Sequence, residues 1–212
     1  MICFPFFEKI DEKNFLIIGG GEVAAEKVSR LRSFTDRITV IAGESTITGV
    51  RVEHRRFEER DLDNADYCIC ATDERAENAR IAGLCHDRGI PVNVADDPEL
   101  CTFIFPALIK RGDLVVGIST SGSSPAYAAR LRGQIEQIIP DHIEQVLGQM
   151  SALRGRLPGE VTVGSRRKEI YGRVLEMLLT AESGFFSEEE GGPDGCLIED
   201  EVRRIVDEYR ED

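Results

Sequence analysis

The chain has 212 residues, a formal net charge of −13, 42% hydrophobic residues and 31% charged residues. This length suits one domain with appendages or two small domains, each with its own core. The acidity argues against a general nucleic-acid binder, because such proteins meet phosphates with a surplus of Lys and Arg. The apolar segment 1–7 is too short for a signal peptide, and no apolar run approaches membrane-spanning length. We therefore expect a cytoplasmic protein that binds neither membrane nor nucleic acid.

A glycine-rich turn near the N-terminus is the most informative local pattern. Apolar residues 15–18 predict a short strand, three glycines follow, and apolar residues then recur at helical spacing. The order Gly19-x-Gly21-x-x-Ala24 fits the dinucleotide-binding fingerprint in the variant that ends in alanine. In that motif Gly19 permits the sharp turn, and Gly21 lets the backbone approach a pyrophosphate at the helix start. The alternative is a purely structural turn.

Strands and helices alternate along the first hundred residues. After the first strand, strand patterns recur at four places: 37–42, 51–54, 67–71 and 91–95. The run 67–71 is apolar nearly throughout, as expected for a strand with helices over both faces of its sheet. A helix begins after Thr72 or Asp73 and ends near Gly89. The expected fold class is α/β, with a Rossmann-like, doubly wound parallel sheet.

The residues after the second strand bear on the choice of cofactor. An acidic residue about 20 positions past the glycines usually binds the ribose 2′-hydroxyl in this fold. Here the strand ends in Ala42-Gly43-Glu44, so Glu44 is the candidate, although it comes slightly late. No arginine stands there to hold a 2′-phosphate, and NAD is therefore favoured over NADP.

Two aspartates follow the strand at 91–95. Asp96 and Asp97 lie where ligands bind in open α/β sheets, past the carboxyl end of a strand. Either is a candidate general base. The alternative is an ordinary turn, because Asp-Asp-Pro is good turn material.

The pattern changes after Asp97. Segments 103–105 and 114–119 predict strands, joined through a turn at 110–113. A loop of small residues, 119–124, then leads into a helix with Ser124 as N-cap and Pro125 in its first turn. This loop is either an anion site or simply a well-capped helix start. Four basic residues flank it and form either a basic patch or a solvated face: Lys110, Arg111, Arg130 and Arg132.

The chain from Asp141 onward predicts helices, with a polar linker at 187–195 before a terminal amphipathic helix. From Glu188 to Asp212 the chain carries eleven acidic and three basic residues. The expected organisation is a dinucleotide-binding domain at 1–112, a small middle region at 113–145 and a helical region at 146–212. The six cysteines form no zinc-like pairs and the three histidines are dispersed, which predicts reduced core thiols and no metal site.

Four motifs together resemble a known family. They are Ile17-Ile18-Gly19-Gly20-Gly21-Glu22-Val23-Ala24, Ala71-Thr72-Asp73, Asn93-Val94-Ala95-Asp96 leading to Phe103-Ile104-Phe105-Pro106-Ala107, and Ile118-Ser119-Thr120-Ser121-Gly122-Ser123-Ser124-Pro125. In this order and spacing they are similar to the precorrin-2 dehydrogenase/sirohydrochlorin ferrochelatase family, the N-terminal part of siroheme synthases.

The resemblance implies a function and assigns residues to it. It implies NAD-dependent oxidation of precorrin-2 to sirohydrochlorin by a homodimer, in some members with iron insertion, and it makes the 113–145 region the dimerisation region. It assigns the key aspartate to Asp96 rather than Asp97. It places cofactor contacts at Gly19, Gly21, Glu22, Val23, Gly43, Glu44 and Thr72. The substrate, with its eight carboxylates, is expected at Thr120, Ser121, Ser123, Ser124 and Arg130. Thr120 stands where the family has a serine.

Two other functions are considered. The first hundred residues also resemble regulatory NAD-binding modules of potassium-transport systems, which sense nucleotides without catalysis. Those modules usually carry an acid directly at the end of the second strand, where this chain has Ala42. An oxidoreductase acting on another small acid would need a placed His or Lys acid/base, and the sequence shows none.

Overall fold

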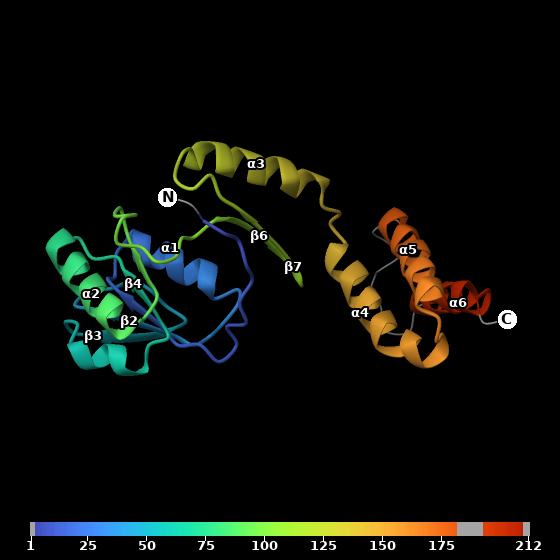
Figure 1. The fold of residues 1–212 in the computed structure, drawn as a ribbon, viewed down its shortest axis with the longest axis horizontal. Helices are drawn as coiled ribbons and strands as arrows, with labels where there is room; N and C mark the ends of the chain where they lie inside the picture. The colour runs from blue at the N-terminus through green and yellow to red at the C-terminus, as the bar shows by residue number, and fades with distance from the viewer. Residues whose placement is uncertain (1–2, 182–192, 210–212) are drawn as a thin grey trace. The chain divides into compact units, whose positions relative to one another are not determined.

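The computed structural model describes residues 3–181 and 193–209, which fold into two compact units (Figure 1). One unit spans Phe4–Phe105, and the second contains the chain from Pro106 onward. The expected first boundary, after residue 112, falls in the turn of a hairpin that belongs entirely to the second unit. The two strands of this hairpin are paired with each other, so the chain divides before them.

The first unit is built on a five-stranded parallel sheet in the order β3-β2-β1-β4-β5. The strands are β1 (Phe15–Ile18), β2 (Ile38–Ala42), β3 (Arg51–His54), β4 (Tyr67–Cys70) and β5 (Val92–Val94). The helices are α1 (Glu22–Leu31), α2 (Arg75–Arg88) and the short 3-10 helix η1 (Glu59–Asn64). The chain runs outward from β1 to β2 and β3, then returns to place β4 on the other side of β1. The expected doubly wound sheet is confirmed, with its switch point between β1 and β4.

Each face of this sheet packs on a different helix. Ile17 of β1 points to a cluster that contains Ala24 and Val28 of α1, whereas Ile18 points to a cluster with Ile81 and Cys85 of α2. This alternation follows from the two-residue period of a strand. All four β1 residues are therefore buried, which explains the continuous apolar run in the sequence.

The expected strand at 103–105 is wrong. Its phenylalanines instead lie on the α1 face of the sheet. The Phe103 ring meets the Tyr67 ring edge-on, with 5.4 Å between their centroids. The Phe105 ring is tilted against the Phe103 ring, with 5.7 Å between those centroids. Tyr67 in turn stacks on Phe15 at 4.9 Å. The segment is apolar because its rings cover the sheet, and its backbone joins no ladder.

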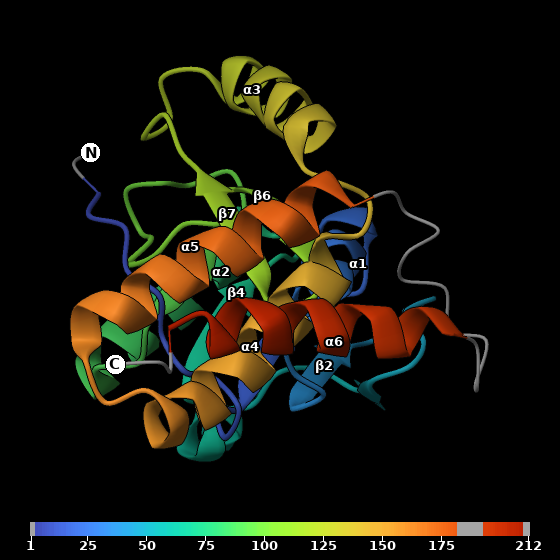
Figure 2. The ribbon, with the colours of Figure 1, turned by 90° about the vertical axis from the view of Figure 1, so that its right-hand side faces the viewer.

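The second unit begins with a hairpin of β6 (Ala107–Arg111) and β7 (Leu114–Ile118), paired antiparallel. Gly112 turns the chain between them at φ 52°. The helix α3 (Pro125–Ile138) packs on the hairpin. Three further helices share an apolar core and lie together in Figure 2: α4 (Ile143–Glu160), α5 (Gly164–Thr180) and α6 (Pro193–Asp207).

The terminal helix packs as its sequence pattern predicts. Ile198, Val202 and Ile205 of α6 are buried in the same core as Leu178 of α5. The expected linker at 187–195 is wrong in its last three residues, which form the first turn of α6, where proline is well tolerated. The rest of that linker lies outside the described residues. In the described part of the chain, no helix combines the length and apolarity needed to cross a membrane.

Candidate functional site

The carboxyl ends of three neighbouring strands lie at one level of the sheet. The amide of Ala71 donates to the carbonyl of Ile18 at 2.8 Å, and the amide of Ala95 donates to that of Cys70 at 2.8 Å. The residues that follow β1, β4 and β5 are therefore side by side. Because parallel strands are about 4.8 Å apart, the start of the loop after β5 is about 10 Å from the glycine turn. This edge holds the switch point, where ligands bind in such sheets.

The three glycines of the turn have different surroundings. Gly19 has φ 126°, and a Cβ there would stand 2.1 Å from the carbonyl oxygen of Ala71. A Cβ at Gly20 would stand 2.1 Å from the carbonyl oxygen of Glu44. At Gly21, no atom of the described residues other than its neighbours along the chain lies within 4 Å of the Cβ position. The first two glycines thus allow close backbone packing, and Gly21 leaves open space at the start of α1.

That open space is suited to an anion. Gly21 is the N-cap of α1, with no side-chain cap, so the first amides of the helix have no partner within it. These amides and the helix dipole attract negative charge. Glu22 and Val23 follow at the exposed start of the helix, Val23 with 40% of its surface accessible. A dinucleotide pyrophosphate fits this position.

The exit of β2 borders the same turn. Gly43 and Glu44 are exposed, and the backbone of Glu44 packs against Gly20. Glu44 therefore lies beside the glycine turn, where a ribose of the bound dinucleotide is expected.

Thr72 lies after β4, and most of its polar atoms are paired with Asn78, a buried neighbour that the sequence does not predict as a site residue. Its hydroxyl donates to Oδ1 of Asn78 at 2.7 Å, and the Asn78 amide donates to the Thr72 carbonyl at 2.9 Å. The Thr72 amide also donates to Asn78, at 3.2 Å. Asn78 is only 4% exposed, on the inner face of α2. The one signal was an amide side chain at a core position of an otherwise apolar helix face. Thr72 and Asn78 together fix the loop between β4 and α2, and this helix begins at Arg75 rather than directly after Thr72.

The two aspartates after β5 differ in their contacts. Asp97 forms an ion pair with Arg75 at 3.0 Å. Asp96 is exposed and, among the described residues, its carboxylate makes no hydrogen bond or ion pair. Its backbone has φ 59°, the left-handed region that costs an L-residue about 1 kcal/mol and that Asp tolerates better than most. Asp97 is thus tied to α2, and Asp96 is free to meet a ligand.

The loop that carries Asp96 is held from both ends. The Cys101 sulfur accepts a hydrogen bond from the Val94 amide at 3.1 Å and donates to the Asp97 carbonyl at 3.3 Å. The buried Asn93 donates through its side chain to the Phe103 carbonyl at 3.0 Å. Burial raises the pKa of the Cys101 thiol, so the sulfur stays protonated and can donate. The sequence predicts an ordinary core thiol at Cys101, and nothing in its spacing indicates this role.

The remaining thiols of this unit lie in the core. Cys68 and Cys70 point to the α2 face with their sulfurs 4.0 Å apart, and Cys85 comes from α2. Hydrogen bonds from Cys70 and Cys85, together with burial, raise the pKa of Cys68 well above its usual value. Within the described residues, no group of three or more acidic, His or Cys side chains is placed to hold a metal ion.

The loop of small residues belongs to the second unit and is closed by its own hydrogen bonds. The hydroxyl oxygens of Ser119, Thr120 and Ser124 accept from the amides of Ser121, Ser124 and Tyr127 at 3.0 to 3.2 Å. Ser124 is the N-cap of α3, as expected. Ser121 has φ 51° and Ser123 is exposed. Each accepting hydroxyl still carries a hydrogen that can be donated to a carboxylate.

The four basic residues around this loop are not equivalent. Arg111 and Arg132 both pair with Glu136, at 3.7 and 3.8 Å. Lys110 donates to the Gly112 carbonyl at 2.7 Å. Arg130 is exposed on α3, two residues past the buried Ala128. Of the four, Arg130 is the best placed to meet an external anion.

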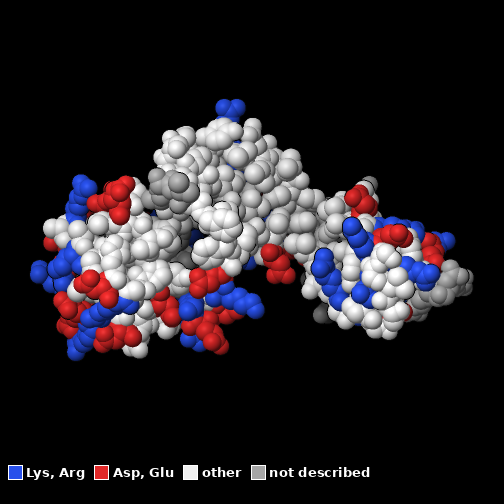
Figure 3. Space-filling view, in the orientation of Figure 1, with Lys and Arg blue, Asp and Glu red and all other residues white. Residues whose placement is uncertain are grey.

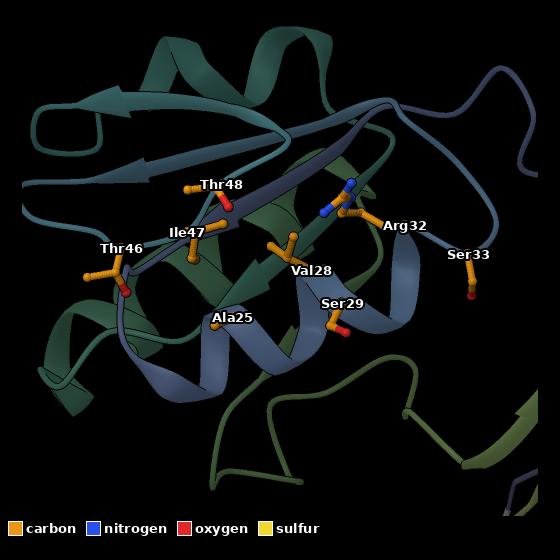
Figure 4. A pocket seen from close by; sticks show the side chains of 8 residues that line it. All are labelled: Ala25, Val28, Ser29, Arg32, Ser33, Thr46, Ile47 and Thr48. Carbon is orange, nitrogen blue, oxygen red and sulfur yellow. The ribbon is translucent and has the colours of Figure 1, made fainter.

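One hollow of about 480 Å³ lies elsewhere in the first unit (Figure 4). It lies between α1 and the segment after β2. Its polar lining consists of Arg32 and several hydroxyl side chains, among them Ser29, Thr46 and Thr48. It includes neither the glycine turn nor Asp96. The candidate site is therefore the open carboxyl edge of the sheet.

Comparison with known proteins agrees with this geometry. Residues 6–107 match a family described as putative NAD(P)-binding, and residues 111–138 match one described as the central part of a sirohaem biosynthesis protein. The chain is 38% identical over 184 residues to the siroheme synthases of Thioalkalivibrio sulfidiphilus and Methylococcus capsulatus. These alignments cover 83% of this chain and 38% and 39% of the two relatives, so the chain spans about two fifths of their length.

A solved structure shows the same fold over nearly the whole chain. It is named SirC, precorrin-2 dehydrogenase, and it matches with a TM-score of 0.68 over 98% of this chain and 100% of that one, at 20% identity. The two family matches follow each other along this chain, at residues 6–107 and 111–138. The chain therefore belongs to the siroheme synthase N-terminal family, which joins an NAD(P)-binding domain to a central sirohaem-biosynthesis domain.

Proposed function

We propose that this protein oxidises precorrin-2 to sirohydrochlorin with NAD, a step in siroheme biosynthesis. The observation that carries the proposal is the Asp96 loop. Asp96, whose carboxylate has no partner among the described residues, is held in a left-handed conformation at the carboxyl edge, two strands along from the glycine turn. Siroheme synthase relatives and the structural likeness to a precorrin-2 dehydrogenase support the choice of substrate.

The residues at the edge fit NAD. The open position at Gly21 and the first amides of α1 would take the pyrophosphate, and Glu44 would bind a ribose hydroxyl. A carboxylate at that position repels a 2′-phosphate, which favours NAD over NADP. When bound, NAD supplies an acceptor for a hydride.

The reaction also needs a base. Oxidation of precorrin-2 removes one hydride and one proton, and the Asp96 carboxylate would take the proton. The loop bonds through Cys101 and Asn93 hold this carboxylate in place, which is what an efficient proton transfer requires.

The substrate's carboxylates need hydrogen-bond donors and positive charge. The hydroxyls of Thr120, Ser121, Ser123 and Ser124, the N-terminus of α3 and Arg130 supply both in the second unit. Thr120 keeps the hydroxyl that this role needs.

We infer that the protein acts as a homodimer in the cytoplasm. The face of α3 and the hairpin seen in Figure 3 is largely free of charged side chains, whereas the first unit carries many of both signs. Tyr127 and Ile138 of α3 are 57% and 78% exposed. Such a surface is typical of one that a second copy covers.

A turnover assay tests the proposed function. Purified protein with NAD and precorrin-2 is expected to form NADH and sirohydrochlorin, both followed by absorbance. Asp96→Asn should abolish turnover and leave NAD affinity unchanged, and Asp97→Asn is the matched control that should retain turnover. If Asp97→Asn loses turnover and Asp96→Asn does not, then Asp97 is the base. Binding of NAD without turnover would support a regulatory nucleotide-binding module instead. Adding Fe²⁺ or Co²⁺ to the same assay tests for metal insertion into the product.

A further inference from the structure

Lys27 is a half-buried cation beside the Asp96 loop that the function described so far does not use. It lies on α1 next to the buried stripe that includes Ala24 and Val28. Side chains on a helix lean toward its N-terminus, so that of Lys27 extends toward the glycine turn and the carboxyl edge of the sheet. Its ammonium lies over the ring of Phe105, with Nζ 4.7 Å from the ring centroid.

The charges around Lys27 come from its own helix and from the loop after β5. Glu26 and Arg30 act on it from α1, and Asp96 and Cys101 act on it from the loop. Among the described residues, Lys27 forms no hydrogen bond and no ion pair. The ring of Phe105 is thus the one close partner that the described part of the chain gives the Lys27 ammonium.

The half-buried charge of Lys27 destabilises the protein when no ligand is bound. Burial lowers the pKa of Lys27, which means that the surroundings disfavour its charge. A cation–π contact repays only part of the lost hydration. A methionine would fill the same space without that cost, because it has a similar length and no charge. A lysine kept in such a place points to an anion that arrives with a ligand.

The location decides which ligand this is. The pyrophosphate of NAD is expected at the first amides of α1, and the adenosine half on the β2 side with Glu44. Phe105, Asp96 and Cys101 instead put the Lys27 ammonium on the β5 side, where the reacting end of the substrate must meet the base. Precorrin-2 brings carboxylates to that side, and the nicotinamide ring brings none.

We propose that Lys27 binds the substrate, its ammonium forming an ion pair with one side-chain carboxylate of the tetrapyrrole next to Asp96. The proposal rests on the proposed function, because it takes a polycarboxylate macrocycle as the ligand. It adds a specificity-determining cation on the NAD-binding unit itself. Lys27 has no part in the hydride or proton transfer.

The test compares three variants with the wild type. Lys27→Met removes the charge and keeps the bulk, Lys27→Arg keeps the charge, and Lys9→Met removes an exposed lysine of the same unit as a control. Five quantities are measured for each: the melting temperature, the Kd for NAD, the KM and kcat for precorrin-2, and the Kd for sirohydrochlorin from its fluorescence. The last is a binding readout that needs no turnover.

Lys27→Met is expected to raise the KM for precorrin-2 and the Kd for sirohydrochlorin by about 10- to 100-fold, the weight of a charged hydrogen bond. Its Kd for NAD should stay within about twofold of wild type. Its melting temperature should be equal or higher, because the buried charge is gone. Lys27→Arg should recover most of the affinity, and Lys9→Met should behave as wild type.

Several results would overturn the proposal. A lower melting temperature with unchanged KM and sirohydrochlorin affinity would make Lys27 a structural residue. A weaker Kd for NAD alone would assign it to the cofactor, and a loss confined to kcat would assign it to the chemistry. Lys27-dependent binding of sirohydrochlorin without turnover would refute the proposed function and support this site. Failure of the wild type to bind sirohydrochlorin at all would refute both.

Discussion

Alanine substitutions at Gly19 and Gly21 should affect different properties. Gly19→Ala should destabilise the fold, whereas Gly21→Ala should weaken NAD binding. Gly19 has φ 126°, a region open essentially to glycine alone, where a side chain costs about 1–3 kcal/mol. Its Cβ would also stand 2.1 Å from the Ala71 carbonyl oxygen, so β4 would have to move. Together these effects should exceed about 3 kcal/mol, a large share of the roughly 5–15 kcal/mol that holds a domain folded. For a unit of about 100 residues this lowers the melting temperature by more than about 12 °C.

Gly21→Ala should leave the fold nearly intact. Gly21 has φ −82°, and within the described residues a methyl group there would meet only its neighbours along the chain. Alanine is a poorer N-cap than glycine, but it also lowers the entropy of the unfolded chain, and the net change should stay within about 1 kcal/mol. The methyl group would, however, stand where the pyrophosphate approaches. Loss of a hydrogen bond to a charged group there weakens NAD binding about tenfold or more.

Thermal unfolding by circular dichroism and NAD titration by calorimetry separate the two effects. If Gly19→Ala melts within about 3 °C of wild type, which is less than about 1 kcal/mol in a unit of this size, then Gly19 is not required for the turn. If Gly21→Ala binds NAD as tightly as the wild type, then the pyrophosphate does not approach Gly21. In that case the turn is a packing device, and the cofactor lies elsewhere.

Three other changes probe parts of the fold outside the glycine turn. Burial and a hydrogen bond to Glu8 raise the pKa of Tyr67 to about 12. This phenol therefore stabilises the fold below pH about 10 and loses that effect as the pH rises toward 12. Phenolate absorbance measures the titration, and ionisation of all tyrosines together would contradict the raised pKa of Tyr67. Asn78→Ala removes the side chain that pairs with the half-buried amide, carbonyl and hydroxyl of Thr72 and should cost about 1–3 kcal/mol in chemical denaturation. A loss below about 0.5 kcal/mol would mean that water replaces the Asn78 amide. Leu178→Ala should cost about 2–5 kcal/mol in the α4–α6 core, where Leu178 is fully buried, and an unchanged denaturation midpoint would show that this core is not packed as described.

The parallel sheet could be predicted from the sequence because its signal is local. Strands β1 and β4 are apolar at nearly every position since helices cover both faces, and glycines and caps mark the helix ends. The strand prediction at 103–105 was wrong for the same reason that the predictions of β1 and β4 were right. A short apolar run records burial, and burial of Phe103 and Phe105 comes from ring packing on a sheet face rather than from strand pairing.

The candidate site could be predicted only in outline. The sequence placed Asp96 and Asp97 at the end of a strand, but residues alone could not separate them. The structure does so through Arg75, 22 positions earlier in the chain, which pairs with Asp97. Lys27 was hidden in the same way, because its surroundings depend on how the chain returns to α1 at Phe105. Contacts of this range have no local signature.

The Asp96 loop shows how a free carboxylate can be held still. A carboxylate that accepts hydrogen bonds from its own protein is held in place, but those bonds occupy the lone pairs that it needs to take a proton. Here the bonds that fix the loop come from the Cys101 thiol, the Asn93 amide and the Asp97 ion pair, and none of them involves the Asp96 carboxylate. The left-handed backbone at Asp96 is a strain of about 1 kcal/mol that these bonds offset. A loop that only had to connect β5 to the next segment would relax this strain with a glycine. An aspartate with its carboxylate unused is the choice expected where that carboxylate has to meet a substrate.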